Sequence, residues 1–347
     1  MFLWHGWLAL LLGTRLEDPL SHVATQGITG VSFFFILSGF VLAWSHRPDD
    51  TPRRFYRRRF ARIVPAYWVA CLLGVALVTL VFDRTGAGRV ALSFLPLSLL
   101  QAWVPHQDAY YAGNTVAWSL SVEVFFYALF PLLIGPVMAL GRRRQAVLLA
   151  GLAAAVLALA LIVHPQAYSG ARFWLLFIDP VPRLLEFVIG ICLCALLLEG
   201  VRIPVRPPVA AAIAIAAFVL VGQLPLDLRL VAGMLIPYSL LIFACAQGDV
   251  EGRRSWLHSP VLLRLGAWSF AFYLLHQLVV RLIAHSLLGH PGTAVRTLAF
   301  VASYLIAIAA AYLLFRWVES PLERRIRGGA RPEVLGATGR AAPPAAA

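Results

Sequence analysis

Charged residues are scarce in this sequence. They make up 13% of its 347 residues, whereas 61% of the residues are hydrophobic. A soluble domain carries roughly twice that share of charge. Apolar stretches of about 20 residues recur along the chain, and each is long enough to cross a bilayer core of about 30 Å. No polar segment is long enough to form a soluble domain of its own. The composition therefore excludes an ordinary soluble protein and indicates a polytopic membrane protein.

Lysine is absent, so the net charge of +13 comes from arginine alone. The arginines cluster in short segments between apolar stretches, which is typical of membrane topology rather than of a nucleic-acid surface. One side of the membrane receives most of them, in segments 47–62, 142–144, 202–206, 253–264 and 316–340. The positive-inside rule makes this side cytoplasmic. We expect a multi-pass protein of the bacterial inner membrane with both termini in the cytoplasm.

Cysteine is also rare. The four cysteines, Cys71, Cys192, Cys194 and Cys245, all lie within apolar stretches. They have neither the spacing of a CxxC motif nor accompanying histidines. Reduced, structural cysteines are the expected reading, and no metal site is predicted.

The apolar stretches predict an all-α bundle of about ten transmembrane helices. We expect these at residues 1–13, 29–46, 64–82, 115–140, 145–163, 179–198, 207–223, 229–246, 261–288 and 294–316. Residues 1–327 then form one membrane domain. Residues 328–347 are rich in alanine, glycine, proline and arginine, and they predict a disordered cytoplasmic tail.

The first helix is too short for a full span, because a charged loop follows it at Gly13 and a span needs about 20 residues. A cleaved signal peptide is disfavoured, since there is no basic leading region and no small-residue cleavage site. We therefore expect that the first helix is incomplete, either because the true start codon lies upstream or because this polypeptide is truncated.

Ionisable side chains inside a membrane span are costly and usually face a protein-lined or water-filled interior. His5 lies about 12 Å below the predicted outer surface, near the middle of the membrane. A neutral imidazole can take a proton from a hydroxyl near pH 7, as an acyl acceptor requires. The alternative is a histidine that only hydrogen-bonds a neighbouring helix.

Two further segments combine small or polar residues with apolar ones. In segment 29–40, Ser38 offers a hydroxyl beside Gly39, although such residues also serve ordinary helix packing. In the fourth helix, Ser119, Glu123 and Tyr127 recur at every fourth position, so they share one face that should point inward. Glu123 could pair with an arginine, orient a histidine or form a purely structural ion pair.

The start of the third helix carries Arg58, Arg59 and Arg62, which lie on one face if this segment is helical. Guanidinium groups bind phosphate in a bidentate manner, so these residues could hold a phosphorylated cytosolic donor such as coenzyme A. The alternative is anchoring to lipid headgroups, which we prefer for Arg53 and Arg54.

The later helices hold two more pairs. Arg183 and Glu186 are three residues apart in the sixth helix and are expected to form a local ion pair. Tyr273 and His276 share one face of the ninth helix. The tenth helix is expected to end at Glu319-Ser320-Pro321.

These pieces occur in a recognisable order. They are a histidine in the first helix, FFxLSGF, RxxRIxP, WSLxxExxFYxxxP, an RxxEF segment followed by Gly190, SxxxYLLH and a final ESP. With this ordered set the chain resembles the integral-membrane acyltransferase family 3 from about residue 5 to residue 321. No single piece is highly specific, but the ordered set is.

The resemblance implies transfer of an acyl group, often acetyl, from cytosolic acyl-coenzyme A to a hydroxyl of a carbohydrate or glycosylated acceptor. It implies an essential catalytic role for His5, donor binding by Arg59 and Arg62, and a functional role for Glu123. Family members usually carry an arginine upstream of this histidine, at a position that here would precede Met1. Many also carry an extracytoplasmic domain that completes transfer, so a separate acyl-accepting partner is possible.

Two mechanisms remain open at this level. His5 either deprotonates the acceptor or carries the acyl group itself, with Glu123 or another intramembrane acid orienting or charging the imidazole. The competing functional class is a transporter or flippase for a lipid-linked saccharide, which would also use intramembrane charges and broken helices.

Overall fold

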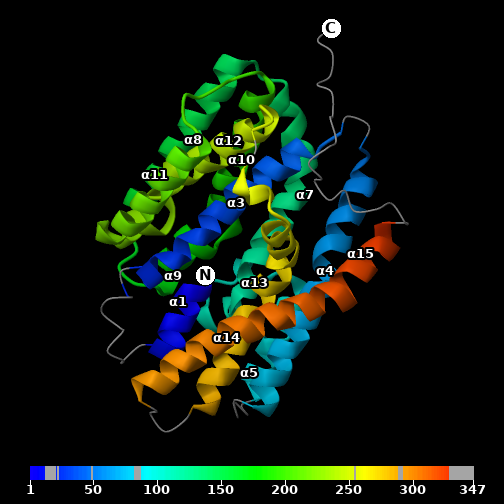
Figure 1. Cartoon of the computed structure of the whole chain (residues 1–347), viewed down its shortest axis with the longest axis vertical. Helices are drawn as coiled ribbons and strands as arrows, with labels where there is room; N and C mark the ends of the chain where they lie inside the picture. The colour runs from blue at the N-terminus through cyan, green and yellow to red at the C-terminus, as the bar shows by residue number, and fades with distance from the viewer. Residues whose placement is uncertain are drawn as a thin grey trace.

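The computed structural model describes residues 1–11, 21, 23–47, 50–81, 87–253, 255–287 and 292–327, and throughout this part the regular structure is helical. Eight helices are long and apolar enough to cross a membrane, and two shorter apolar helices, Phe2–Leu11 and Pro207–Gln223, accompany them. They pack as a tall bundle, and the chain begins midway along its long axis (Figure 1). The predicted all-helical membrane bundle is thus confirmed.

The principal helices occur in one continuous order along the chain. Their bounds are α1 Phe2–Gly6, α3 Gly30–Trp44, α4 Pro52–Leu80, α5 Ala87–Ser93, α6 Gln107–Tyr110, α7 Trp118–Met138, α8 Arg142–Val163, α9 Gly170–Phe173, α10 Pro180–Leu198, α11 Pro207–Leu220, α12 Leu235–Val250, α13 Pro260–Ser286, α14 Thr293–Leu314 and α15 Ser320–Arg327. Short 3-10 or π-helical turns extend α1 to Leu11 and precede α3, α7, α10, α12 and α15.

Helix α4 starts a full three turns before its predicted position. Thr51 caps it by accepting a hydrogen bond from the backbone N–H of Arg54 (3.4 Å), and Pro52 occupies the first helical turn. Proline is favoured there because the N–H that it lacks would be unpaired anyway. The arginine-rich segment is therefore helical rather than a loop, and it extends the membrane helix beyond its apolar part.

The expected end of the last helix at Glu319-Ser320-Pro321 is wrong. A π-helical turn, Phe315–Glu319, joins α14 to α15, and the helical path continues to Arg327. Pro321 is the second residue of α15, which directly follows the π-helical turn. The predicted loop at 13–19 and the predicted tail at 328–347 lie outside the described residues.

Helices α3 and α10 are in backbone contact at the centre of the bundle. A Cβ atom added at Gly39 would lie 1.9 Å from the carbonyl oxygen of Phe187, and one added at Gly190 would lie 2.0 Å from that of Ile36. Only glycine permits this approach. The same crossing is filled by aromatic packing, with Phe126 of α7 stacked on Phe187 at 4.9 Å between ring centroids.

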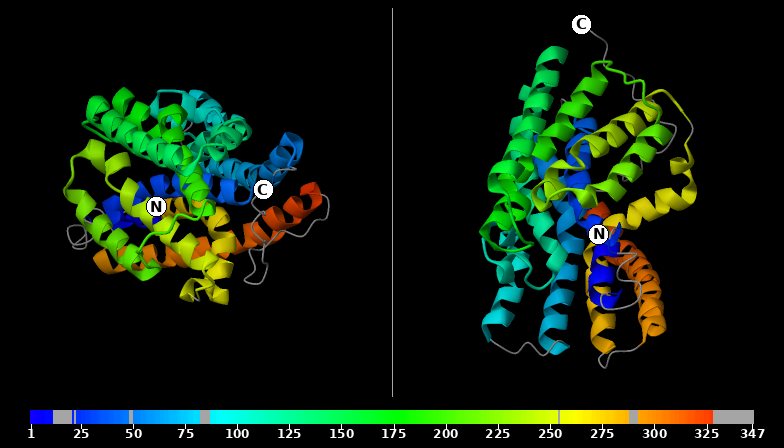
Figure 2. Two further views of the ribbon diagram at one scale, coloured as in Figure 1. Left: turned by 90° about the horizontal axis from the view of Figure 1, so that it is seen from above. Right: turned by 90° about the vertical axis from the view of Figure 1, so that its left-hand side faces the viewer.

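A second unit is formed by α13 and α14, which pack along each other. Helix α1 packs on both of them, and α14 runs obliquely across the bundle (Figures 1 and 2). This arrangement brings the start of the chain against α13, which follows it by more than 250 residues.

Candidate active site

Two histidines from opposite ends of the sequence meet in the bundle. The Nδ1 atom of His5 on α1 lies 2.9 Å from the Nε2 atom of His276 on α13. His276 is only 1% exposed, whereas His5 is half-buried. Within the described residues, Nε2 of His5 has no hydrogen-bond partner. The pair therefore leaves one imidazole nitrogen of His5 available for chemistry.

The ring of His276 is held firmly in place. Its Nδ1 atom lies 2.8 Å from the carbonyl oxygen of Tyr273 and 3.2 Å from that of Phe272. The ring stacks on the Phe272 ring with centroids 5.6 Å apart and an interplanar angle of 14°. Phe2 of α1 packs against the same ring, so both helices fix its orientation.

Helix α13 is tied to the start of α7 by residues within the turn that precedes His276. The hydroxyls of Tyr273 and Ser119 lie 2.6 Å apart, and the Tyr273 hydroxyl also donates to the carbonyl oxygen of Val116 (3.1 Å). The side-chain amide of Asn114 donates to the carbonyl oxygen of Leu274 (2.8 Å). These buried bonds anchor α13 beside α7 at the level of the histidine pair.

A second polar cluster lies one helical turn further along α7. The carboxylate of Glu123, 3% exposed, accepts a hydrogen bond from the hydroxyl of Ser38 on α3 (3.1 Å) and a short one from that of Tyr127. Both of its partners are donors, which suits an ionised carboxylate. Glu123 thus bonds to Ser38 and Tyr127, while His5 bonds to His276, so the structure does not join the two predicted catalytic residues directly.

Ser119, Glu123 and Tyr127 nevertheless form one polar stripe along α7. At 1.5 Å per residue the stripe is about 12 Å long. At one end, Ser119 contacts Tyr273 beside the histidine pair. At the other end, the guanidinium of Arg59 lies 5.9 Å from the ring centre of Tyr127. Polar groups therefore recur along α7 between the arginine-rich start of α4 and the histidine pair.

The three arginines of α4 have different surroundings. Arg58 binds both carboxylate oxygens of Asp50, one of them at 2.7 Å, and this hydrogen bonding holds the pKa of Asp50 below its ordinary value. Arg62 forms ion pairs with Glu319 and, at 3.5 Å, with Glu323 of the last helix.

Arg59 differs from its two neighbours. Its guanidinium lies 5.7 Å from the ring centre of Phe55, in addition to its contact with Tyr127. In the described part of the chain it makes no hydrogen bond or ion pair, and its buried Nε atom is unpartnered. The sequence predicted the shared face of the three arginines. It did not indicate that Asp50 pairs with Arg58, or that Glu319 and Glu323 pair with Arg62.

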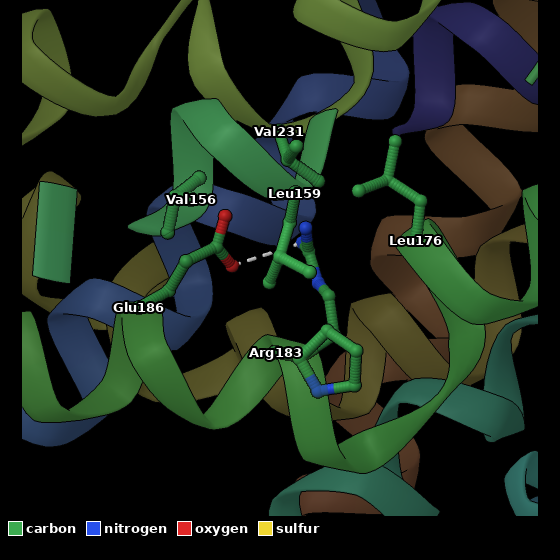
Figure 3. Close-up of a pocket in the computed structure, with 7 residues that line it drawn as sticks. Val156, Leu159, Leu176, Arg183, Glu186 and Val231 are labelled. Atoms are coloured by element: carbon green, nitrogen blue, oxygen red, sulfur yellow. Dashed lines mark ion pairs between the residues drawn. The ribbon is translucent and has the colours of Figure 1, made fainter. Parts of the chain in front are cut away.

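Arg183 and Glu186 form the predicted local ion pair, at 3.0 Å, and each is 1% exposed. Arg183 also donates to the hydroxyl of Ser32 on α3 (3.1 Å), and its guanidinium lies between the rings of Phe35 and Phe177. Figure 3 shows the pair at a small cavity lined mainly by apolar side chains. The cavity volume of about 10 Å³ is room for one water molecule at most, so this is not a substrate pocket.

A family model described as an acyltransferase domain matches residues 1–316. The chain belongs to acyltransferase family 3. It is therefore a multi-pass membrane enzyme that transfers acyl groups other than aminoacyl groups.

Individual relatives agree with this assignment. The enzyme is 38% identical over 338 residues to acyltransferase MdmB of Streptomyces mycarofaciens, covering 92% of this chain and 86% of the relative. It is 31% identical to exopolysaccharide production protein ExoZ of Rhizobium meliloti, covering 94% and 98%. It is 26% identical to nodulation protein 10 of Rhizobium leguminosarum bv. viciae, covering 82% and 81%. No solved structure matches.

Proposed function

We propose that this acyltransferase moves an acyl group, most simply acetyl, from cytosolic acyl-coenzyme A to a hydroxyl of a carbohydrate or glycosylated acceptor, with His5 as the base. The observation that carries the proposal is the histidine pair at one end of the polar stripe of α7, whose other end lies at Arg59. Membership of an acyltransferase family favours this class over a transporter or flippase.

The donor would enter at the arginine-rich end of α4, which the positive-inside rule assigns to the cytoplasm. Coenzyme A is rich in phosphate, and a guanidinium binds phosphate with two parallel hydrogen bonds. Arg59 is the member of the trio that makes no direct ion pair within the described residues, so it is the first choice for this contact. Arg58 and Arg62, through their ion pairs with Asp50 and Glu319, fix the helix that carries Arg59.

The thioester would then reach past Tyr127, Glu123 and Ser119, in that order, towards His5. Glu123, held by Ser38 and Tyr127, places a negative charge between Arg59 and the histidine pair. In this position it keeps the stripe polar and balances the charge of Arg59. We therefore assign Glu123 to the donor path rather than to direct contact with the imidazole.

The chemical step uses the free nitrogen of His5. Its Nε2 atom takes the proton of the acceptor hydroxyl as the oxygen attacks the thioester carbon. The carbon–sulfur bond breaks, and the thiolate of coenzyme A leaves and receives the proton from the imidazolium. In the other route, Nε2 attacks the thioester carbon, the carbon–sulfur bond breaks and the thiolate of coenzyme A leaves. The acceptor oxygen then displaces the imidazole from the acyl carbon, and the proton of the hydroxyl passes to the thiolate. Trapping an acyl-protein adduct with labelled acetyl-coenzyme A separates the two routes.

The name of a relative supports the proposed acceptor class. ExoZ is named for exopolysaccharide production, and it matches this chain over nearly its whole length. A sugar hydroxyl also suits a base of modest strength such as imidazole. A separate extracytoplasmic partner could take the acyl group in place of a free saccharide.

Inverted and right-side-out membrane vesicles test donor and topology together. Labelled acetyl-coenzyme A does not cross a bilayer, so transfer to an oligosaccharide pool is expected when the donor meets the cytoplasmic face, and release of coenzyme A should match it. Transfer that needs no coenzyme A thioester, or a donor used only from the opposite face, would contradict the proposal.

A further inference from the structure

The hydrogen bonds of His276 determine which of its ring nitrogens carries the proton. Its Nδ1 atom faces two backbone carbonyl oxygens, those of Tyr273 at 2.8 Å and Phe272 at 3.2 Å. A carbonyl oxygen only accepts hydrogen bonds, so Nδ1 of His276 must carry the proton. In a neutral imidazole the other nitrogen, Nε2, is then an acceptor.

The accepting Nε2 atom of His276 in turn determines the tautomer of His5. Its Nδ1 atom lies 2.9 Å from the accepting Nε2 of His276, so it must donate. The opposite tautomer of His5 would bring two lone pairs together. The proton of a neutral His5 therefore sits on Nδ1, and its Nε2 atom, which has no partner in the described residues, bears the lone pair.

The surroundings of His276 make this a fixed arrangement. The ring stacks on Phe272, and the adjacent backbone is tied to α7 by the bonds of Tyr273 and of Asn114. Both ring nitrogens of His276 are used, one on the backbone and one on His5. His276 is thus unable to act as the base itself without breaking one of these bonds.

We propose that His276 is a positioning residue that selects the Nδ1-protonated tautomer of His5, so that Nε2 points its lone pair at the acceptor hydroxyl. The proposal rests on the function proposed above for His5. When Nε2 takes the proton of the hydroxyl, the Nδ1–H of the resulting imidazolium still donates to Nε2 of His276. No proton needs to move between the two rings, and His276 stays neutral throughout the step.

Two substitutions separate positioning from packing. His276→Leu fills the space but removes the acceptor, so His5 is free to adopt either tautomer. His276→Gln keeps an accepting oxygen near the place of Nε2. Gln277→Leu is the matched control, because it also removes a buried polar group from the next residue of α13.

Kinetics in native-like membranes give the first readout. For His276→Leu we expect kcat to fall about 10–100-fold, a usual effect of losing the partner that orients a functional histidine. The KM for acetyl-coenzyme A should change little, since the donor is held elsewhere. His276→Gln should recover most of kcat, and Gln277→Leu should behave like wild type. An unchanged kcat in folded His276→Leu, or equal losses in the leucine and glutamine variants, would overturn the proposal.

The second readout uses the wild-type enzyme, so it does not require the His276 variants to fold. Solid-state NMR of the wild-type enzyme with ¹⁵N-labelled histidine reports which ring nitrogen is protonated, and the His5 signals are assigned by their loss in His5→Gln. We expect a protonated Nδ1 and a bare Nε2 in His5. The reverse pattern would refute the selection of this tautomer. If His5→Gln retained full activity, the proposed role of His5 as the base would be wrong. The NMR result would still show which tautomer His5 adopts.

Discussion

The crossing of α3 and α10 gives a quantitative prediction for Gly39→Ala. The new Cβ atom would lie 1.9 Å from the carbonyl oxygen of Phe187, whereas real contacts of this kind are at least 3.0 Å long. The two helices must therefore separate by about 1 Å, the minimum that relieves this overlap. The contact is with backbone, so no side-chain rotation can relieve it.

Separation by this amount also affects a buried hydrogen bond. The bond from Arg183 on α10 to Ser32 on α3 is 3.1 Å long, and a further 1 Å places it beyond hydrogen-bond range. Overpacking costs about 1–3 kcal/mol, and a lost bond to a charged group costs a comparable amount. We expect Gly39→Ala to lower the free energy of unfolding by about 3 kcal/mol, within the range of these combined costs.

This change is measured by thermal unfolding in detergent, monitored as the loss of the monodisperse peak in size-exclusion chromatography. Gly151→Ala in α8 is the control, because nothing lies within 4 Å of its added Cβ and alanine favours a helix by up to about 1 kcal/mol. Equal stability of the two variants would show that the helices are not in backbone contact and would refute the packing described for α3 and α10.

The remaining predictions concern the arginines and the buried pair. Arg59→Gln should raise the KM for acetyl-coenzyme A about tenfold, the effect of losing one charge-assisted contact of about 1.4 kcal/mol. Arg58→Gln should instead act mainly on the fold, because it leaves Asp50 unpaired. Steady-state kinetics in membranes compare the two, and an equal KM for Arg59→Gln and wild type would remove Arg59 from the donor site. Arg183→Met or Glu186→Leu alone should destabilise the fold by about 3–5 kcal/mol, because each leaves a buried charge uncompensated. The double variant should be more stable than either single variant in the same unfolding assay, and an additive loss would argue against a buried charged pair.

Much of the fold is predictable from the sequence, because the bilayer imposes long apolar segments on it. Eight of the ten predicted spans begin within four residues of their helices, for example at Thr115 and Pro207. The two exceptions are the helices that begin at Pro52 and Gly170, well before their predicted starts. Their early starts have a physical reason. Helix formation continues beyond the apolar part of a span when capping and packing support it, and hydropathy does not register that continuation.

The candidate site was only partly predictable. Local spacing identified the stripe of Ser119, Glu123 and Tyr127, because residues four apart share a helix face. It could not pair His5 with His276, since 271 residues separate them and only the packing of α1 on α13 brings them together. The sequence predicted that Glu123 orients or charges the imidazole of His5. In the folded protein, the hydrogen-bond partner of His5 is His276 instead.

The central claim is that Nε2 of His5 is the group that activates the acceptor. It is tested most directly by the single-turnover rate of acyl transfer in His5→Gln, measured in membranes with saturating labelled acetyl-coenzyme A. We predict a fall of at least about 10²-fold, the usual contribution of a positioned general base, with donor binding retained. A folded His5→Gln enzyme that transfers the acyl group at the wild-type rate would contradict the claim.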